Sequence, residues 1–435
     1  MPTFKIDEGF IGERNQQLEH EVAEDSDPMR QAAAGLANVA AAKPSREQMS
    51  RNARVPVPVT MLDQDSTLVV VLELSARSWL VGARVPGIGR MSRYALAPSA
   101  EALAAWLDTA KARAGTAGRM VVRVVLAYEA GRDGFWLARY LEARGVEVYV
   151  IQPSSVLVDR RARRAKTDAL DVEMLMRTLL AWLRGEPGVC SMVPIPDVAE
   201  EDGRRPVRER QGLIGERLAL LNEIDGLLAT FGITGYRPLR RDRRAQLAAL
   251  RTPEGDPLAT NAAARIGRIL ARLELVMQQI AELEQARDAV LAKEAASGAA
   301  ETMIRGLARL KGIGAELATV LVWEAYVRSF PNRKALGAYA GLTGTPFASG
   351  STTREQGISK AGNRRLRSSL VELAWLWLRY QPDSKLAAWF RGRTGSAGSR
   401  MRKVMIVALA RKLLVALWRF CRDGVLPEGA ALKAT

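Results

Sequence analysis

Apolar positions between residues 61 and 190 are grouped in short runs of four to nine residues, separated by polar turns. The runs are rich in Val, Ile and Leu and are short for helices, so they predict buried strands. The five predicted strands are Thr67–Leu74, Ser78–Val85, Arg93–Leu96, Arg119–Ala127 and Val146–Ile151. The second run follows the first after a few residues, so we expect these two strands to form a hairpin.

Amphipathic stretches between and after these runs predict three helices. The first is capped by Ser99 and runs to about Ala114, the second covers Phe135–Arg144 and ends at Gly145, and the third runs from Thr167 to about Leu183. Three strands, helix, strand, helix, strand and helix is the order of an α/β domain with a mixed sheet. This order matches the ribonuclease-H/RuvC-like arrangement, and we place that domain at residues 61–190.

Residues 205–300 have a helical pattern around a loop at Thr252–Pro257. Apolar residues recur at spacings of 4, 3, 4 and 3 over Ile269, Leu273, Val276, Ile280 and Leu283, and a partner row is formed by Leu220, Ile224 and Leu227. This spacing is a coiled-coil seam about two heptads long. An ordinary helical hairpin within one chain and a dimerising coiled coil both explain it.

The segment 301–425 predicts a mainly helical third domain. Leu310–Gly314 lies between two helical patterns and resembles the turn of a helix-hairpin-helix, whose backbone N–H groups can face a phosphate. Two further helices are expected at Arg364–Tyr380 and Met401–Cys421, separated by a Gly/Ser/Arg loop at Arg391–Arg400. Residues 1–60 are acidic, then Ala-rich, then Pro-interrupted, and we expect a disordered or loosely docked leader.

The 435-residue chain has a formal net charge of +17, which is concentrated near its end. From Glu301 onward there are 23 Lys or Arg against 8 Asp or Glu, whereas the first 60 residues hold 7 against 9. A basic surface of this kind favours a polyanionic partner, because each phosphate contact releases counterions. The sequence therefore predicts binding to a nucleic acid, chiefly by the last third of the chain.

Several classes of site are excluded by residue counts. The single histidine, His20, rules out a Ser-His-Asp triad, a Cys-His pair and a His-rich zinc site. The two cysteines, Cys190 and Cys421, are far apart, which fits a reducing, cytoplasmic location rather than a disulfide framework. No run is apolar enough for a membrane helix. Any metal site must use carboxylates, which suit Mg²⁺ or Mn²⁺.

Four carboxylates stand at positions where α/β sheets bind ligands. Glu73 lies in the most apolar strand, Glu129 follows another strand directly, and Asp168 and Asp171 are three apart on one helix face. Each has an ordinary alternative, such as a solvent-facing strand residue or an acidic first turn. Together they could hold two divalent ions about 4 Å apart for phosphodiester cleavage. The adjacent cations could contact a phosphate backbone or form a solvated charge run: Arg160, Arg161, Arg163, Arg164 and Lys166.

These motifs resemble the DEDD transposases of insertion sequences, of the IS-one-ten and IS-eleven-eleven type, some of which are described as bridge-RNA-guided recombinases. The resemblance covers roughly Leu68 to Phe420 and rests on LELSARSWLV, on YEAGRDGFWLARYLEARGVEVYVIQP and on RRAKTDALDVEML. It extends to LKGIGAELATVLVWE and to the stretch from FPNRKALGAYAGLTG to ISKAGNRRLRSSLVELAW. In this match Glu129, Asp168 and Asp171 take family acidic positions, and Glu73 stands where the family has Asp.

The resemblance implies a serine nucleophile and a metal-dependent strand transfer. Ser349, with Ser351 as the close alternative, matches the family serine that attacks a DNA phosphate while the carboxylates hold Mg²⁺ or Mn²⁺. It also implies DNA donor and target sites, a guide RNA and a dimer or tetramer acting on DNA, with nucleoid association when bound to it. We expect phosphate or RNA contacts from Lys311, Arg354, Lys360, Asn363, Arg364 and Arg365.

Glu73 is the main departure from the family pattern, because its extra methylene moves the carboxylate by about 1 Å. Active sites of this kind tolerate errors of about 0.5 Å. Asp63 and Asp65 are nearby substitutes in a different register. Two rival functions therefore stand beside the transposase: a RuvC-like structure-selective nuclease that uses water, and a nucleic-acid-binding relative without activity.

Overall fold

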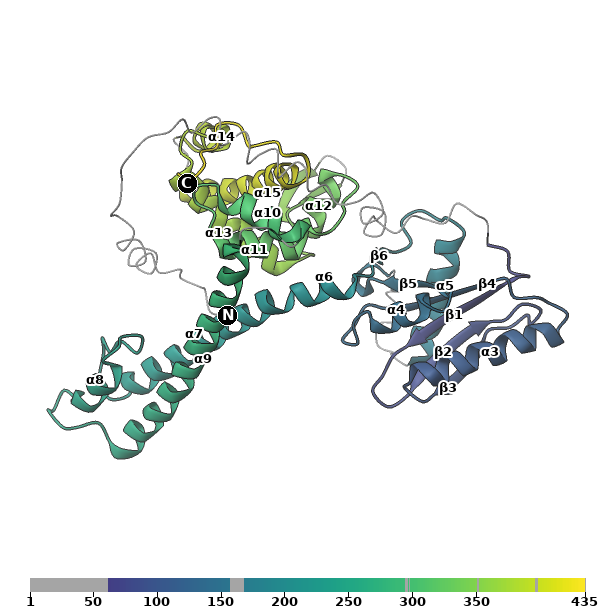
Figure 1. Cartoon of the computed structure of the whole chain (residues 1–435), viewed down its shortest axis with the longest axis horizontal. Coiled ribbons are helices and arrows are strands. Elements are labelled where there is room, and N and C mark those ends of the chain that lie inside the picture. Colours follow the sequence, from purple (N-terminus) through teal and green to yellow (C-terminus); the bar gives the residue numbers. More distant parts are fainter. Residues whose placement is uncertain are drawn as a thin grey trace.

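The computed structural model describes residues 62–156, 168–293, 298–349, 352–395 and 398–434, together with Ala296 (Figure 1). The first body is built on a six-stranded sheet in the order β3-β2-β1-β4-β5-β6. The strands are β1 (Thr67–Glu73), β2 (Trp79–Arg84), β3 (Ser92–Leu96), β4 (Arg123–Glu129), β5 (Glu147–Ile151) and β6 (Met192–Val193). The central strands β1, β4 and β5 are parallel and the outer ones antiparallel, so the sheet is mixed as predicted.

Both faces of the sheet are covered by helices, and the alternation of side chains decides which residues meet which helix. Even-numbered residues of β1 and β4, such as Leu68 and Leu126, pack with α3 (Ala100–Thr116) and α4 (Trp136–Glu142). Odd-numbered residues, such as Val71 and Ala127, pack with α5 (Asp168–Leu183). The sheet is therefore the middle layer of three, with α5 on one side and α3 and α4 on the other.

A helical arm follows the sheet. It consists of α6 (Val198–Gly203), α7 (Arg205–Ala229), α8 (Arg243–Ala249) and α9 (Thr260–Ala292). In Figure 1 α7 and α9 run side by side, with α8 at their far end. Their shared core contains Leu220 and Ile224 from α7 and Ile269, Leu273 and Val276 from α9. The seam predicted from the sequence is thus used for a hairpin within the chain.

The last body is mainly helical, as expected, and has its own core. Its elements are α10 (Ala299–Ala308), α11 (Ala315–Leu321), the π-helical turn η4 (Val322–Tyr326), α12 (Arg333–Tyr339), β7 (Gly344–Ser349), β8 (Thr352–Ile358), α13 (Arg364–Tyr380), α14 (Lys385–Thr394) and α15 (Ser399–Asp423). The turn between α10 and α11 contains Gly312 at φ +81°, a left-handed conformation that glycine adopts readily.

Some predicted boundaries were wrong. The strand expected from Arg119 begins only at Arg123, because the preceding backbone pairs with Ser66 and leaves Met120 and Val122 exposed. The loop expected at Arg391–Arg400 begins late, since α14 continues to Thr394. The sequence patterns also missed α6, α12, β6 and the β7–β8 hairpin, which are short or polar. Within the described ranges, no helix is long and apolar enough to cross a membrane.

Candidate functional site

Glu73 and Glu129 lie at the same edge and on the same face of the sheet. Each is the last residue of its strand, and the adjacent parallel strands are paired up to Leu72 and Tyr128, one residue before each glutamate. Their odd numbers place both on the face covered by α5, where each is half-buried. Neither glutamate is therefore a fully solvent-facing strand residue, which was the ordinary alternative to a functional role.

The first turn of α5 carries Asp168 and Asp171 above this face. Asp168 is exposed and Asp171 half-buried. The helix is seated closely on the sheet next to them, since a Cβ on Gly82 of β2 would collide with the side chain of Val172. Glycine at position 82 therefore permits the close approach that brings this turn towards the β1–β2 side of the sheet.

The donor set suits a hard divalent cation, because it consists of carboxylate oxygens. In the described part of the chain, however, no group of three or more His, Cys, Asp or Glu side chains is placed to hold a metal ion. The four carboxylates thus share a face without forming a closed ligand set. Asp63 and Asp65 precede β1 and so lie at its opposite end from Glu73, which removes them as substitutes.

Ser349 is the last residue of β7 and is exposed. It pairs with Thr352 across the β7–β8 hairpin. The base of the hairpin is tied down by the Ser359 N–H, which donates to the Thr343 carbonyl over 2.9 Å. Ser349 and the four carboxylates belong to different bodies, joined through α6 and α7 (Figure 1).

The predicted nucleic-acid contacts have different surroundings. The run Arg160–Lys166 and the residue Ser351 lie outside the described residues, as does the side chain of Arg354. Lys311, Lys360 and Arg364 are exposed. The N–H of Lys311 donates to the carbonyl of Ala431, so the last residues of the chain lie against this turn. Lys360 has φ +55°, an uncommon conformation for a residue with a side chain.

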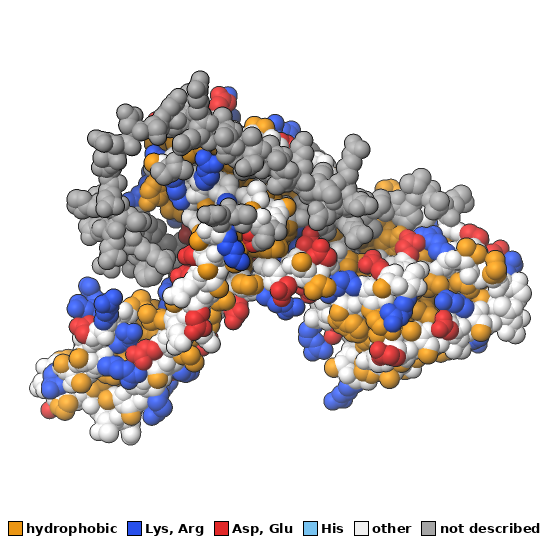
Figure 2. Space-filling model, in the orientation of Figure 1, with side chains coloured by type: hydrophobic (Ala, Val, Ile, Leu, Met, Phe, Trp, Pro, Cys, Tyr) orange, Lys and Arg blue, Asp and Glu red, His pale blue; other side chains and the backbone are white. Residues whose placement is uncertain are grey.

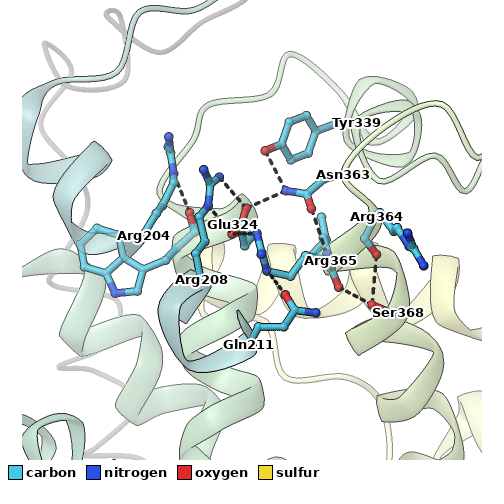
Figure 3. A network of polar contacts seen from close by, with 11 residues as sticks. Arg204, Arg208, Gln211, Glu324, Tyr339, Asn363, Arg364, Arg365 and Ser368 are labelled. Carbon is cyan, nitrogen blue, oxygen red and sulfur yellow. Dashed lines mark hydrogen bonds and ion pairs between the residues drawn. The ribbon is translucent and has the colours of Figure 1, made fainter. Parts of the chain in front are cut away.

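Asn363 and Arg365 instead take part in a polar network centred on Glu324 (Figure 3). Glu324 lies in η4 and its side chain is 0% exposed. Arg208 of α7 contacts both carboxylate oxygens, at 3.0 and 3.2 Å. The Asn363 amide donates to the same carboxylate at 2.7 Å and to the Tyr339 hydroxyl at 3.2 Å.

The same network fixes the start of α13. The Asn363 side-chain oxygen accepts the N–H of Leu366 and caps the helix, and Arg365 lies 3.4 Å from Glu324. The Arg365 guanidinium also donates to Gln211 of α7. Sequence patterns do not show a buried carboxylate in a π-helical turn, because its partners come from α7 and from the start of α13.

Charge determines the protonation of Glu324. Burial is the largest influence and raises the pKa of its carboxyl, but hydrogen bonds from Arg208 and Asn363 and the charges of Arg208 and Arg365 outweigh it. The net effect is a pKa below the ordinary value of 4.5. Glu324 is therefore ionised at neutral pH and acts as an anchor for two arginines.

The junction of α6 and α7 also contacts η4. The Arg204 guanidinium donates to the carbonyl of Trp323 over 3.0 Å. A Cβ on Gly203 would collide with the Trp323 ring, so the indole rests directly on this backbone. The chain that leaves the sheet is thus held against the C-terminal body by close packing and by ion pairs.

Comparisons with known proteins match this chain to transposases. Residues 305–388, which include Glu324, Ser349 and Asn363, match the model described as "Transposase IS116/IS110/IS902 family". A putative transposase of Sinorhizobium fredii, y4rJ, is 47% identical over 395 residues, which cover 88% of this chain and 99% of the relative. The transposase for insertion sequence element IS1328 of Yersinia enterocolitica is 26% identical, over 69% of this chain and 84% of its own length.

A third relative, the transposase for insertion sequence element IS1111A of Coxiella burnetii, is 23% identical over 70% of this chain and 79% of its own length. The chain belongs to the IS116/IS110/IS902 family of transposases. The resemblance found in its motifs is thereby confirmed at the level of the family.

Proposed function

We propose that this transposase cuts and rejoins DNA strands with Ser349 as nucleophile and with a divalent metal held by Glu73, Glu129, Asp168 and Asp171. The observation that carries the proposal is the placement of Glu73 and Glu129 on one edge and one face of the sheet, beside the first turn of α5. The strand order and the layers support a RuvC-like fold for this body.

Phosphodiester transesterification gives each group a balanced role. The Ser349 hydroxyl loses its proton as its oxygen forms a bond to phosphorus, and the bond from phosphorus to one deoxyribose oxygen breaks. That deoxyribose oxygen takes up a proton and leaves as a hydroxyl. A hydroxyl of the second strand then attacks the phosphoserine and frees the serine. When bound, Mg²⁺ or Mn²⁺ would stabilise the charge that develops on the phosphate oxygens.

The carboxylate domain and the serine hairpin must meet on one phosphate for this route. We infer DNA as the substrate, and a guide RNA and a dimer or tetramer as further parts of the complex. Exposed Lys311, Lys360 and Arg364 are the described residues that we assign to phosphate contacts, together with the basic run before Asp168. Asn363 and Arg365 have side chains that already contact Glu324, and we assign them to the positioning of α13 instead.

The test is DNA strand exchange by the purified protein with guide RNA and Mg²⁺, together with an assay for a protein–DNA adduct. We expect Ser349→Ala and Asp168→Ala to lose exchange, and Ser349→Ala to lose the adduct. Asp108→Ala is the matched control, since Asp108 is an exposed aspartate on α3 and should leave activity unchanged. An active Ser349→Ala would move the nucleophile to Ser351 or to water.

Position 73 has its own outcome in this assay. Glu73 is one methylene longer than Asp, so Glu73→Asp tests whether the site has adjusted to the longer side chain. A loss of strand exchange in Glu73→Asp would mean that the site has adjusted to glutamate. Rescue of an inactive wild-type protein by Glu73→Asp would mean that the longer side chain disables the site.

A RuvC-like nuclease that uses water is the second candidate. The observation that favours it is the position of Ser349 in a different body from the carboxylates. Mg²⁺-dependent cleavage that survives Ser349→Ala, without an adduct, would establish this alternative. Binding without any cleavage would instead establish a relative that has lost its activity.

A further inference from the structure

A row of arginines lines one side of the helical arm. Arg265, Arg268 and Arg272 of α9 surround a shallow depression with Glu223 of α7, and Ile269 forms its floor. Spacings of three and four residues place the arginines on one face of α9. Figure 2 shows Lys and Arg side chains gathered on the part of the arm that carries α8.

One carboxylate serves two of these three cations. Arg265 lies 2.9 Å and Arg272 3.4 Å from the two oxygens of Glu223. Their side chains remain 55% and 58% exposed, so both guanidiniums keep faces open to solvent. Arg268 lies between them, is exposed, and makes no ion pair with any residue in the described ranges.

Stability of the arm does not explain the row. The α7–α9 core is apolar and contains Ile266, Leu270 and Leu273, which are fully buried. Exposed ion pairs contribute about 0–1 kcal/mol. Like charges three or four residues apart on a helix cost about 0.2–0.5 kcal/mol per pair. The arginines therefore add little to folding, and Arg268 opposes it slightly.

We propose that Arg265, Arg268 and Arg272 bind the phosphodiester backbone of a nucleic acid. Arg265 and Arg272 are seven residues apart, or about 10 Å along the helix axis. A nucleic-acid strand carries a phosphate about every 3.4 Å of duplex axis, so about three phosphates pass over the row. Guanidinium groups suit phosphate because they donate in a planar fork.

Glu223 neutralises part of the charge of this site, because its carboxylate pairs with the outer two guanidiniums and competes with a phosphate for them. This site lies on the arm, apart from the sheet edge and from Ser349, and it rests on the proposed action of the protein on nucleic acid. DNA and RNA share the backbone chemistry, so the experiment must separate them.

The experiment measures binding of the full-length protein to labelled duplex DNA and single-stranded RNA by fluorescence anisotropy over a series of salt concentrations. For each phosphate contact removed, the slope of log K against log salt falls by about 0.9 on duplex DNA and about 0.7 on single strands. Arg265→Ala/Arg268→Ala/Arg272→Ala should therefore lower the slope by about 2.7 on DNA or about 2.1 on RNA. The polymer that shows the change is the ligand.

Three variants guard the interpretation. Arg184→Ala is the matched control, because Arg184 is also an exposed arginine paired with a glutamate, and it should leave the slope unchanged. The triple Arg→Lys variant keeps the charge and should retain most of the slope. Glu223→Gln removes the competing carboxylate and should tighten binding, whereas a purely structural pair would give no gain.

Unchanged slopes on both polymers in the triple alanine variant would overturn the proposal, as would weaker binding by Glu223→Gln. Thermal melting of each variant checks that the arm is folded. Ser349→Ala should bind like the wild type in this assay, because it leaves the row intact. Loss of strand exchange with normal binding therefore tests the proposed chemistry of Ser349. A lower slope of log K against log salt tests the proposed binding site on the arm.

Discussion

The two halves of α7 are held in different ways. Its second half packs on α9 through Leu220, Ile224 and Leu228, which form an apolar core. Its first half meets the C-terminal body through Arg208 and the buried carboxylate of Glu324. Apolar burial is non-directional and scales with area, whereas a buried ion pair requires every partner in place.

The difference separates two functions of one helix. The apolar half makes the arm a unit, and small changes in side-chain volume there are absorbed by repacking. The polar half decides how the arm and the sheet are placed against the body that carries Ser349. We therefore expect the contact with Glu324 to be the more sensitive of the two.

Glu324→Ala should have the largest effect. It removes the buried carboxylate that Arg208, Arg365 and the Asn363 amide share, and breaking a buried pair in this way costs about 3–5 kcal/mol. Denaturant unfolding monitored by tryptophan fluorescence measures the loss. Glu428→Ala is the control, since the Glu428–Lys385 pair is exposed and should contribute about 0–1 kcal/mol. Equal losses in the two variants would contradict the role of Glu324.

Ile224→Ala should come next. It removes a fully buried side chain from the arm, at a cost of about 2–5 kcal/mol. Unlike the loss in Glu324→Ala, this loss should change little with salt, because no charge is involved. Chemical unfolding at low and high salt distinguishes the two. A strong salt dependence in Ile224→Ala would remove the contrast between the two halves of α7.

Gly203→Ala should have a smaller effect, of about 1–3 kcal/mol, because its Cβ would collide with the Trp323 ring. Gly215→Ala is the matched control on α7, where a Cβ meets nothing within 4 Å and alanine favours the helix by about 1 kcal/mol. Thermal unfolding should therefore move in opposite directions for the two variants. A change of the melting temperature in the same direction for both variants would show that the Trp323 ring moves to accommodate the added Cβ.

The smallest expected effect is the loss of the stability contribution of Glu324 at acid pH. The pKa of Glu324 is lowered in the folded chain, so its contribution to stability is present above the ordinary value of 4.5 and is lost as pH falls through the lower folded pKa. The stability difference between wild type and Glu324→Gln should therefore shrink below about pH 4.5. A constant difference down to about pH 3, far into the acid range, would mean that the carboxylate does not titrate there.

Sequence patterns located most of the regular structure. The buried strand cores and the helices α3, α5 and α13 follow from local apolar periodicity, and Ser99 caps α3 as expected. The missed elements are short, such as β6, or depend on pairing with a distant segment, such as β7 and β8. Local periodicity carries little information about either kind of element.

The candidate site divides in the same way. Strand alternation and parallel order are local or topological, so Glu73 and Glu129 could be placed on one edge from the sequence. Glu324 could not be found in this way, because nothing near it in the chain indicates that Arg208 and Asn363 will meet it. Arg365 likewise looks like a surface cation in the sequence and is half-buried in the fold.

The sequence alone determined the family, the mixed α/β order, the basic C-terminal third and the residue types that chemistry can use. Those properties follow from composition and short-range spacing, which folding does not alter. Only the tertiary structure decided that the heptad seam closes within the chain and that Glu324 joins α7 to α13. It also decided that Glu223 of α7 lies against Arg265 and Arg272 of α9, because contacts between distant segments depend on how the chain packs.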